Sequence, residues 1–416
     1  MKLLLTPSSL RGTVTVPPSK SLLHRELICR FLAGQVTELP PHAAQDVLAT
    51  YRGLACLTAP APLVDCGDSG STLRFLLPLF MALGRTDAVF TGSDRLLSRP
   101  IPGDLGLRRT EQGLALTRPL TAGHWSLPGD ETSQLISGML LALPLLPGDS
   151  DITVTGEAVS RPYVQMTLAV LDLHGVTVEK ITDGWHIPGG QFCRPAPLLD
   201  EPDWSAAAYW LVLRALLPRQ PGGQFCRPAP LLDEPDWSAA AYWLVLRALL
   251  PRQRREALRI PLAPPPYLQG DAAILRYLDK LPEQIDISDT PDLLPPLALY
   301  AALRPGRDTR FTHAAFLRQK RRKESDRLTA VSAVLNALGA SAEVQPDGLV
   351  IHGVSALHGG DVSACGDHRI ALLAGCAAMV ADGPVTLSGA ETVAKSYPAF
   401  WRELAALGGN WEVLES

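Results

Sequence analysis

Short apolar segments alternate with amphipathic segments along the chain, and this alternation limits the fold more than any other feature. Residues 12–18, 151–155 and 176–178 have the length and β-branched content of strands. Strands separated by helices are typical of an α/β protein rather than an all-helical or all-β one. The apolar periodicity predicts helices at 19–32, 71–83, 130–145, 160–173, 271–281, 292–303, 325–338, 368–380 and 397–407.

A perfect tandem repeat interrupts this pattern. Residues 188–220 and 221–253 are identical. A single doubling does not make a solenoid, which needs at least three units to bury a continuous core. Each copy contains a loop, an Asp-Glu-Pro-Asp-Trp-Ser cap and an apolar helix. One place in a fold holds one copy, so the other packs as an insert or stays loosely attached, and the sequence leaves open which copy is native.

Length and composition narrow the class of protein. With 416 residues the chain is too long for one ordinary core, which favours two domains. The net charge of −4 gives no reason to expect a nucleic-acid or membrane partner. None of the seven cysteines forms a CxxC pair, so we expect no metal site. The first residues lack the apolar run of a signal peptide, and we expect a cytoplasmic protein with reduced thiols.

Cations and hydroxyls recur at the predicted helix starts. A helix N-terminus attracts anions, because its free N–H groups and dipole favour negative charge. Taken singly, each start is equally typical of an ordinary capped helix. Taken together, they predict an anion-binding site in an acidic protein. The residues concerned are Lys20, Gly70, Gln134, Ser160, Arg327 and Arg369.

Two acidic residues have competing interpretations. Glu324 lies in the charge cluster 321–327, which is either a solvated helix start capped by Ser325 or Asp326, or a phosphate and carboxylate site with a proton-transferring glutamate. Asp292 heads an apolar helix, where it is either a cap or a base that accepts a hydroxyl proton.

The motifs as a set resemble the 5-enolpyruvylshikimate-3-phosphate (EPSP) synthase family, in family order over nearly the whole chain. The Ser-Asp-Thr-Pro-Asp form of residues 288–292 and the Asp-Trp-Ser-Ala-Ala form of the repeated segment are most similar to members from Bacteroidetes. The matching segments are 18–25, 69–74, 97–101, 132–134, 160–163, the Asp-Trp-Ser-Ala-Ala-Ala-Tyr helix, 268–271, 291–292, 323–327, 367–369 and 394–398.

This resemblance implies a fold and its domains. We expect two similar domains, each of three βαβαββ-type units with helices enclosed by sheets: an inside-out α/β barrel, the enolpyruvyl transferase fold. One domain would be residues 15–197, and the other 1–14 with 230–416. The duplication at 188–253 would lie at the second crossing of the chain between the domains.

The resemblance also implies a reaction of the shikimate pathway. The family transfers the enolpyruvyl group of phosphoenolpyruvate to the 5-hydroxyl of shikimate 3-phosphate and releases phosphate, without a cofactor. Lys20, Asp292 and Glu324 would be catalytic, in an enzyme that acts on small molecules as a monomer. Shikimate 3-phosphate would contact Lys20, Ser21, Arg25, Ser133, Gln134, Ser160, Tyr163, Asp292 and Lys323; phosphoenolpyruvate would contact Lys20, Gly70, Arg99, Gln134, Arg327, Arg369 and Lys395.

The chain departs from the family pattern in two further places. Residues 321–323 look like an insertion, which leaves open whether Lys320 or Lys323 contacts substrate. Asp68 and Ser69 replace the usual Asn-Ala before Gly70, and the retained glycine predicts sensitivity to glyphosate. One alternative is UDP-N-acetylglucosamine enolpyruvyl transferase, which carries a cysteine in the loop matching 96–101, where this chain has none. The other is a non-catalytic binding protein of the same fold, which the duplication leaves open.

Overall fold

The computed structural model describes residues 1–8, 10, 12–13, 18–39, 42–101, 105–130, 133–197, 258–259, 268–318 and 324–415. Lys323 and the repeat from residue 198 onward lie outside these residues. The chain divides into a discontinuous unit, Met1–Ser19 with Asp200–Ser416, and a continuous unit, Lys20–Leu199. Each unit has its own hydrophobic core.

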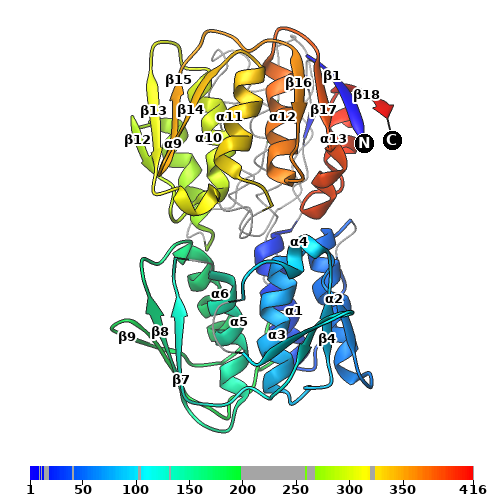
Figure 1. Ribbon diagram of the computed structural model, residues 1–416, viewed down its shortest axis with the longest axis vertical. Coiled ribbons are helices and arrows are strands. Elements are labelled where there is room, and N and C mark those ends of the chain that lie inside the picture. Colours follow the sequence, from blue (N-terminus) through cyan, green and yellow to red (C-terminus); the bar gives the residue numbers. More distant parts are fainter. Residues whose placement is uncertain are drawn as a thin grey trace. The chain divides into compact units, whose positions relative to one another are not determined.

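The continuous unit contains two four-stranded sheets with one topology (Figure 1). In each sheet the first two strands are parallel, and the last two form an antiparallel hairpin whose second strand pairs with the second strand of the sheet. One sheet has the order β3-β4-β6-β5, with β3 (Leu63–Asp65), β4 (Val89–Thr91), β5 (Leu107–Thr110) and β6 (Gly113–Leu116); the other has the order β7-β8-β10-β9, with β7 (His124–Pro128), β8 (Ser150–Thr155), β9 (Glu179–Ile181) and β10 (Gly184–Ile187).

The helices of this unit supply most of its core. Two of them are apolar on nearly every side and almost wholly buried, as expected of helices that sheets enclose. Gly138 permits their close approach, because a Cβ there would lie 2.0 Å from the carbonyl oxygen of Arg74. The helices are α1 (Lys20–Leu32), α2 (Gln45–Ala55), the buried α3 (Gly70–Ala82), α4 (Asp94–Leu97), the buried α5 (Ser133–Ala142) and α6 (Arg161–Leu173).

The discontinuous unit repeats this topology (Figure 1). In one of its sheets, the N-terminal strand β1 takes the place of the last hairpin strand, pairing antiparallel with both neighbours. The sheets are β12-β13-β15-β14, with β12 (Gln284–Asp286), β13 (Asp308–Thr312), β14 (Ser341–Gln345) and β15 (Gly348–His352), and β16-β17-β1-β18, with β16 (Gly360–Ser363), β17 (Val385–Ser388), β1 (Lys2–Thr6) and β18 (Asn410–Glu415).

Two further strands and the remaining helices complete the description of this unit. The short strands β2 (Gly12–Thr13) and β11 (Leu258–Arg259) pair in parallel. The helices are α9 (Ile274–Asp279), α10 (Leu294–Ala302), α11 (Arg327–Ala337), α12 (His368–Val380) and α13 (Phe400–Ala406), with short 3-10 segments η3 (Gly270–Ala273), η4 (Pro291–Leu293), η5 (Ala315–Arg318) and η6 (Ala390–Lys395).

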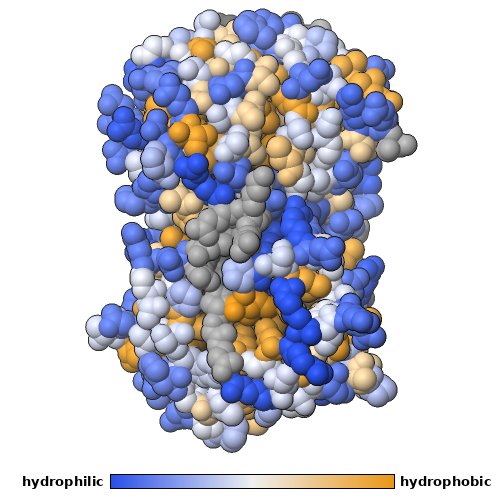
Figure 2. Space-filling model, viewed as in Figure 1, coloured by the Kyte–Doolittle hydropathy of each residue, from blue (hydrophilic) through white to orange (hydrophobic). Residues whose placement is uncertain are grey.

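These elements confirm the α/β class and the two similar domains of βαβαββ units. Two such units are complete among the described residues of each domain. No described helix is long and apolar enough to cross a membrane. Figure 2 shows hydrophilic residues over much of the visible face, with hydrophobic ones gathered in places.

The predicted strand at 176–178 is wrong. Gly175 adopts a left-handed conformation with φ 73°, and the N–H of Val176 donates to the carbonyl of Leu171. These residues therefore close the C-terminus of α6, in the manner of a glycine C-cap, and the strand β9 follows them. The valines at 176 and 178 pack against the core without joining a sheet.

Candidate active site

The six helix starts singled out in the sequence are helix starts in the structure. Lys20, Gly70 and Arg327 are the first residues of α1, α3 and α11. Gln134 and Arg369 are second in α5 and α12, and Ser160 is the N-cap of α6. Four of these residues belong to the continuous unit and two to the discontinuous unit.

In the continuous unit, Lys20 forms an ion pair that the sequence did not predict. Its Nζ lies 3.0 Å from Oδ2 of Asp46, which stands in the first turn of α2. Both side chains are nearly buried, so the ammonium is held in one place beside the start of α1. Asp46 thereby becomes a candidate partner for Lys20, which the sequence predicts to be catalytic.

Arg25 lies one turn further along α1 and is fixed inside the same unit. Its Nε donates to Thr167 Oγ1 at 2.7 Å, and its Nη2 donates to the carbonyl of Tyr163 at 2.8 Å. A third bond joins Nη1 to the carbonyl of Ser21. Arg25 therefore ties α1 to α6 and brings Ser21 and Tyr163, two predicted substrate contacts, to one place.

Gly70 lies at the meeting point of three polar side chains. A Cβ at this position would lie 2.9 Å from Arg74 Nη1, 3.1 Å from Gln134 Oε1 and 3.3 Å from Arg99 Nη1. Gln134 accepts a bond from Arg74 and donates one to Ser71, which orients its amide. Two cations beside a helix N-terminus form an anion-attracting corner, and Arg74 joins the predicted residues there.

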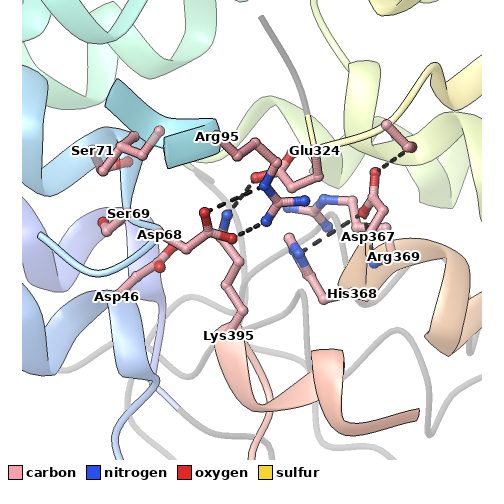
Figure 3. A network of polar contacts seen from close by, with 12 residues as sticks. Asp46, Asp68, Ser69, Ser71, Arg95, Glu324, Asp367, His368, Arg369 and Lys395 are labelled. Carbon is pink, nitrogen blue, oxygen red and sulfur yellow. Dashed lines mark hydrogen bonds and ion pairs between the residues drawn. The ribbon is translucent and has the colours of Figure 1, made fainter. Parts of the chain in front are cut away.

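The loop before Gly70 carries a second ion pair. Arg95 contacts the carboxylate of Asp68 (Figure 3). Ser93 Oγ donates to Asp68 Oδ1 at 2.6 Å. Asp68 is one of the residues at which the sequence departs from the family pattern. The ion pair gives this substitution a structural role in holding the loop against α4.

Ser160 has an unusual backbone for its type. Its φ of 58° and ψ of 35° are left-handed, and its side chain makes no capping bond to α6. A non-glycine residue in this conformation is strained, and such strain concentrates at functional positions. The hydroxyl of Ser160 is thereby released from the usual N-cap role. Ser133, another predicted substrate contact, is the first residue of α5 and is buried.

The discontinuous unit holds a network of cations and carboxylates. Arg327 is 2 % exposed, and its Nη1 lies 2.7 Å from Asp292 Oδ1. Its Nε and Nη2 both lie 3.3 Å from Asp367 Oδ2, which also accepts a bond from Ser325. Burial opposes the charge on Arg327, but Asp367 and Asp292 outweigh it, so the pKa of the guanidinium is raised.

Asp292 and Glu324 each bridge cations in this network. Asp292 Oδ2 accepts from Arg369 Nη2 at 2.6 Å, in addition to its bond with Arg327. Glu324 Oε1 accepts from Lys395 Nζ at 2.6 Å, and its Oε2 lies 3.6 Å from Arg327 Nη2. Figure 3 shows Glu324, Arg369 and Lys395 among the residues drawn. A carboxyl group between two cations can release and regain a proton while the charge around it stays balanced.

Of the two predicted caps in the charge cluster, the structure confirms Asp326. Its side chain accepts a bond from the N–H of Thr329 and caps α11, while Glu324 precedes the helix. Asp292 lies in the 3-10 segment η4, after its N-cap residue Thr290. Both carboxylates are therefore available to the cationic network.

Asp367 is the functional candidate that sequence reasoning missed in this unit. It is fully buried, caps α12 through the N–H of Arg369, and accepts two bonds from Arg327. Its position in the Asp-His-Arg motif gave a sequence signal, but the pairing with Arg327 depends on tertiary packing. Within the described ranges, no group of three or more metal-binding side chains is found.

A two-domain fold of βαβαββ units, with cations and carboxylates at the starts of its helices, defines the class of the enolpyruvyl transferases. Among solved structures, the chain is similar to EPSP synthase from Acinetobacter baumannii, with TM-score 0.69 and 22% identity over 100% of both chains. It is also similar to the enolpyruvyl transferase NikO from Streptomyces tendae, with TM-score 0.64 and 18% identity, covering 99% of this chain and 98% of that one. These two likenesses concern the fold.

The chain belongs to the EPSP synthase (3-phosphoshikimate 1-carboxyvinyltransferase) family, whose sequence model matches residues 42–220 and 269–404. It is 33% identical to a 3-phosphoshikimate 1-carboxyvinyltransferase from Clostridium acetobutylicum, over 98% of this chain and 97% of the relative. A relative of the same name from Halobacterium salinarum is 31% identical, over 97% of this chain and 98% of the relative.

Proposed function

We propose that the two clusters are the active-site residues of a 3-phosphoshikimate 1-carboxyvinyltransferase. The enzyme transfers the enolpyruvyl group of phosphoenolpyruvate to the 5-hydroxyl of shikimate 3-phosphate and releases phosphate. It acts in the shikimate pathway, which supplies aromatic amino acids. The observation that carries the assignment of roles is the position of Glu324 between Lys395 and Arg327.

Glu324 gives and takes the proton at the methylene carbon of phosphoenolpyruvate. Its carboxyl group needs access to both protonation states, and the neighbouring cations compensate the change of charge. Asp292 accepts the proton of the 5-hydroxyl as it attacks C2. The two guanidiniums that hold Asp292 keep its carboxylate oriented for this step.

The remaining cations bind the substrate anions. Arg327, Arg369 and Lys395 in the discontinuous unit, and Arg99 with the α3 N-terminus at Gly70 in the continuous unit, suit the carboxylate and phosphate of phosphoenolpyruvate. Lys20 is a shared contact of both substrates. Shikimate 3-phosphate is held by Lys20, Ser21, Arg25, Ser133, Gln134, Ser160, Tyr163, Asp292 and, outside the described residues, Lys323.

The alternative functions have less support. A UDP-N-acetylglucosamine transferase would carry a cysteine in residues 96–101, which is absent from the sequence. A non-catalytic protein of this fold is less favoured, because the charged residues expected of the active site are all present in the sequence. We expect the enzyme to act as a cytoplasmic monomer and to require no cofactor.

Phosphate release from shikimate 3-phosphate and phosphoenolpyruvate tests this function. Glu324→Ala removes the proton-transferring group, so we expect kcat to fall by about 10²- to 10⁴-fold. Glu343→Ala is the matched control, because this exposed glutamate lies on β14 of the same unit. Full activity of Glu324→Ala would refute its role, and no phosphate release by the unmodified chain would refute the function.

A further inference from the structure

A buried row of polar side chains connects His24 to the loop that precedes Gly70. His24 Nδ1 lies 2.7 Å from Thr50 Oγ1, which lies 2.7 Å from Thr72 Oγ1. Thr72 Oγ1 lies 2.8 Å from Ser69 Oγ, the N-cap of α3. None of the four residues is more than 1% exposed, and all belong to the continuous unit.

The row crosses three helices close to their N-termini. His24 follows Lys20 by one turn of α1, and Thr50 follows Asp46 by one turn of α2. Thr72 lies in the first turn of α3 and also donates to the carbonyl of Asp46 at 3.1 Å. The row therefore lies directly behind both the Lys20–Asp46 ion pair and the anion-attracting corner at Gly70.

The direction of the hydrogen bonds follows from the state of His24. Burial lowers the pKa of His24 to about 3, so the imidazole is neutral and carries one N–H. Its Nε2 is buried and has no hydrogen-bond partner among the described residues. An unpaired buried donor is costly, so the proton belongs on Nδ1, which donates to Thr50. Thr50 then donates to Thr72, whose single O–H is shared between Ser69 Oγ at 2.8 Å and the carbonyl oxygen of Asp46 at 3.1 Å.

We propose that His24 is a positioning residue for the phosphoenolpyruvate subsite, acting through Thr50 and Thr72 on Ser69. By fixing Ser69, the row holds the α3 N-terminus and its free N–H groups where an anion binds. His24 itself contacts no substrate. The inference rests on the proposed function, because it assigns the Gly70 corner to phosphoenolpyruvate.

A packing role is the competing explanation. The ring of His24 stands edge-on to Phe75, with 6.1 Å between the ring centroids. If His24 only filled space, an apolar residue of similar size would serve equally well, and the hydroxyl of Thr50 would not matter for substrate affinity. Thr50→Val and Thr50→Ser separate the two explanations, since valine keeps the shape and serine keeps the hydroxyl.

The test combines KM for phosphoenolpyruvate with melting temperature. His24→Leu and Thr50→Val are expected to raise this KM by about tenfold, which corresponds to one lost hydrogen bond, and to change kcat less. His24→Asn, whose amide can donate in place of Nδ1, and Thr50→Ser are expected to stay within about threefold of the unmodified enzyme. Thr309→Val, a buried threonine on β13 of the other unit, is the control.

Equal KM values in Thr50→Val and Thr50→Ser would overturn the proposal, as would unchanged KM in His24→Leu. If a variant of Thr50 fails to fold, the same comparison is made between Thr72→Val and Thr72→Ser. If the unmodified chain releases no phosphate, the proposed function fails. The positioning role is then judged by the thermal shift that phosphoenolpyruvate alone produces: it must be smaller in Thr50→Val than in Thr50→Ser.

Discussion

His24 should make the continuous unit lose stability in mild acid. Burial lowers its pKa to about 3 in the folded protein, from 6.5 in the unfolded chain. Below 6.5 the unfolded state therefore binds a proton that the folded state does not. The contribution to stability is present above pH 6.5 and is lost progressively as the pH falls toward 3.

The size of the effect follows from this difference. At about pH 5 the unfolded imidazole is protonated and the folded one is not. This pH lies about 1.5 units below the unfolded pKa of 6.5, and at about 1.36 kcal/mol per unit the loss of stability is about 2 kcal/mol. This loss of stability is the same for any pKa of His24 in the folded protein that lies well below about 5. The charged groups that act on His24 are Asp46, which raises its pKa, and Lys20 and Arg25, which lower it.

Hydrogen exchange of the α1 amides is a suitable assay, because it reports on the continuous unit without requiring both units to unfold together. The opening free energy is compared between about pH 7.5 and about pH 5 in the unmodified protein and in His24→Asn. The variant keeps a donor toward Thr50 but does not titrate, so its pH-dependent loss should be smaller by about 2 kcal/mol. The same pH-dependent loss in both proteins would refute the reasoning.

Three other changes have defined outcomes. Gly70→Ala places a Cβ against the tips of Arg74 and Gln134, so the fold should persist while KM for phosphoenolpyruvate rises and inhibition by glyphosate becomes weaker than in the unmodified enzyme. Undiminished activity of the unmodified enzyme in saturating glyphosate would contradict this, as would equal inhibition of the two proteins. Asp367→Asn removes one of the three carboxylates that surround Arg327, and should cost about 1.5–3 kcal/mol of stability in urea unfolding and most of kcat/KM. Burial raises the pKa of Glu403 to about 7 from 4.5, so its stabilising contribution is lost as the pH rises through this window. The difference in melting temperature between Glu403→Gln and the unmodified protein should therefore favour the variant more at about pH 9 than at about pH 4. An equal difference at both pH values would exclude the titration.

Local sequence signals predicted the helix starts that carry the site. A cap, a glycine or a cation at the first turn is set by groups within about four residues, because the free N–H groups of a helix end bind nearby side chains. Asp326 is one example, since it was predicted as a cap and its side chain accepts from the N–H of Thr329. The helix α12 is another, since its observed range is the predicted range 368–380. The alternation of strands and helices predicted the α/β class for the same reason.

The partners of the charged residues could not be predicted in this way. Asp46 stands 26 positions from Lys20 in a helix that periodicity did not reveal, and Asp367 stands 40 positions from Arg327. These pairs exist because helices distant in sequence begin side by side within each unit. The row from His24 to Ser69 is hidden for the same reason, since each member alone is an ordinary buried polar residue.

The duplication can now be placed in relation to the two units. The structure describes residues 188–197 of the first copy, which continue directly from β10. This loop is bonded to the continuous unit at several points: Gly190 N donates to Leu146 O at 2.6 Å, Arg194 N to His174 O at 2.8 Å, and Ala196 N to Gln35 Oε1 at 3.2 Å. The first copy therefore supplies this loop.

The continuous unit is thus complete in sequence before the chain reaches the second copy. Because the copies are identical, deletion of 188–220 and deletion of 221–253 give the same protein, so a deletion tests whether the extra residues matter and not which copy is native. We expect the shortened enzyme to be at least as active as the full chain, and an inactive one would contradict the view that one copy is superfluous. Exchange protection of α1 should be the same in both proteins, so a gain in activity on deletion would originate in the discontinuous unit, for which the chain offers two copies of a segment that the sequence predicts to be helical.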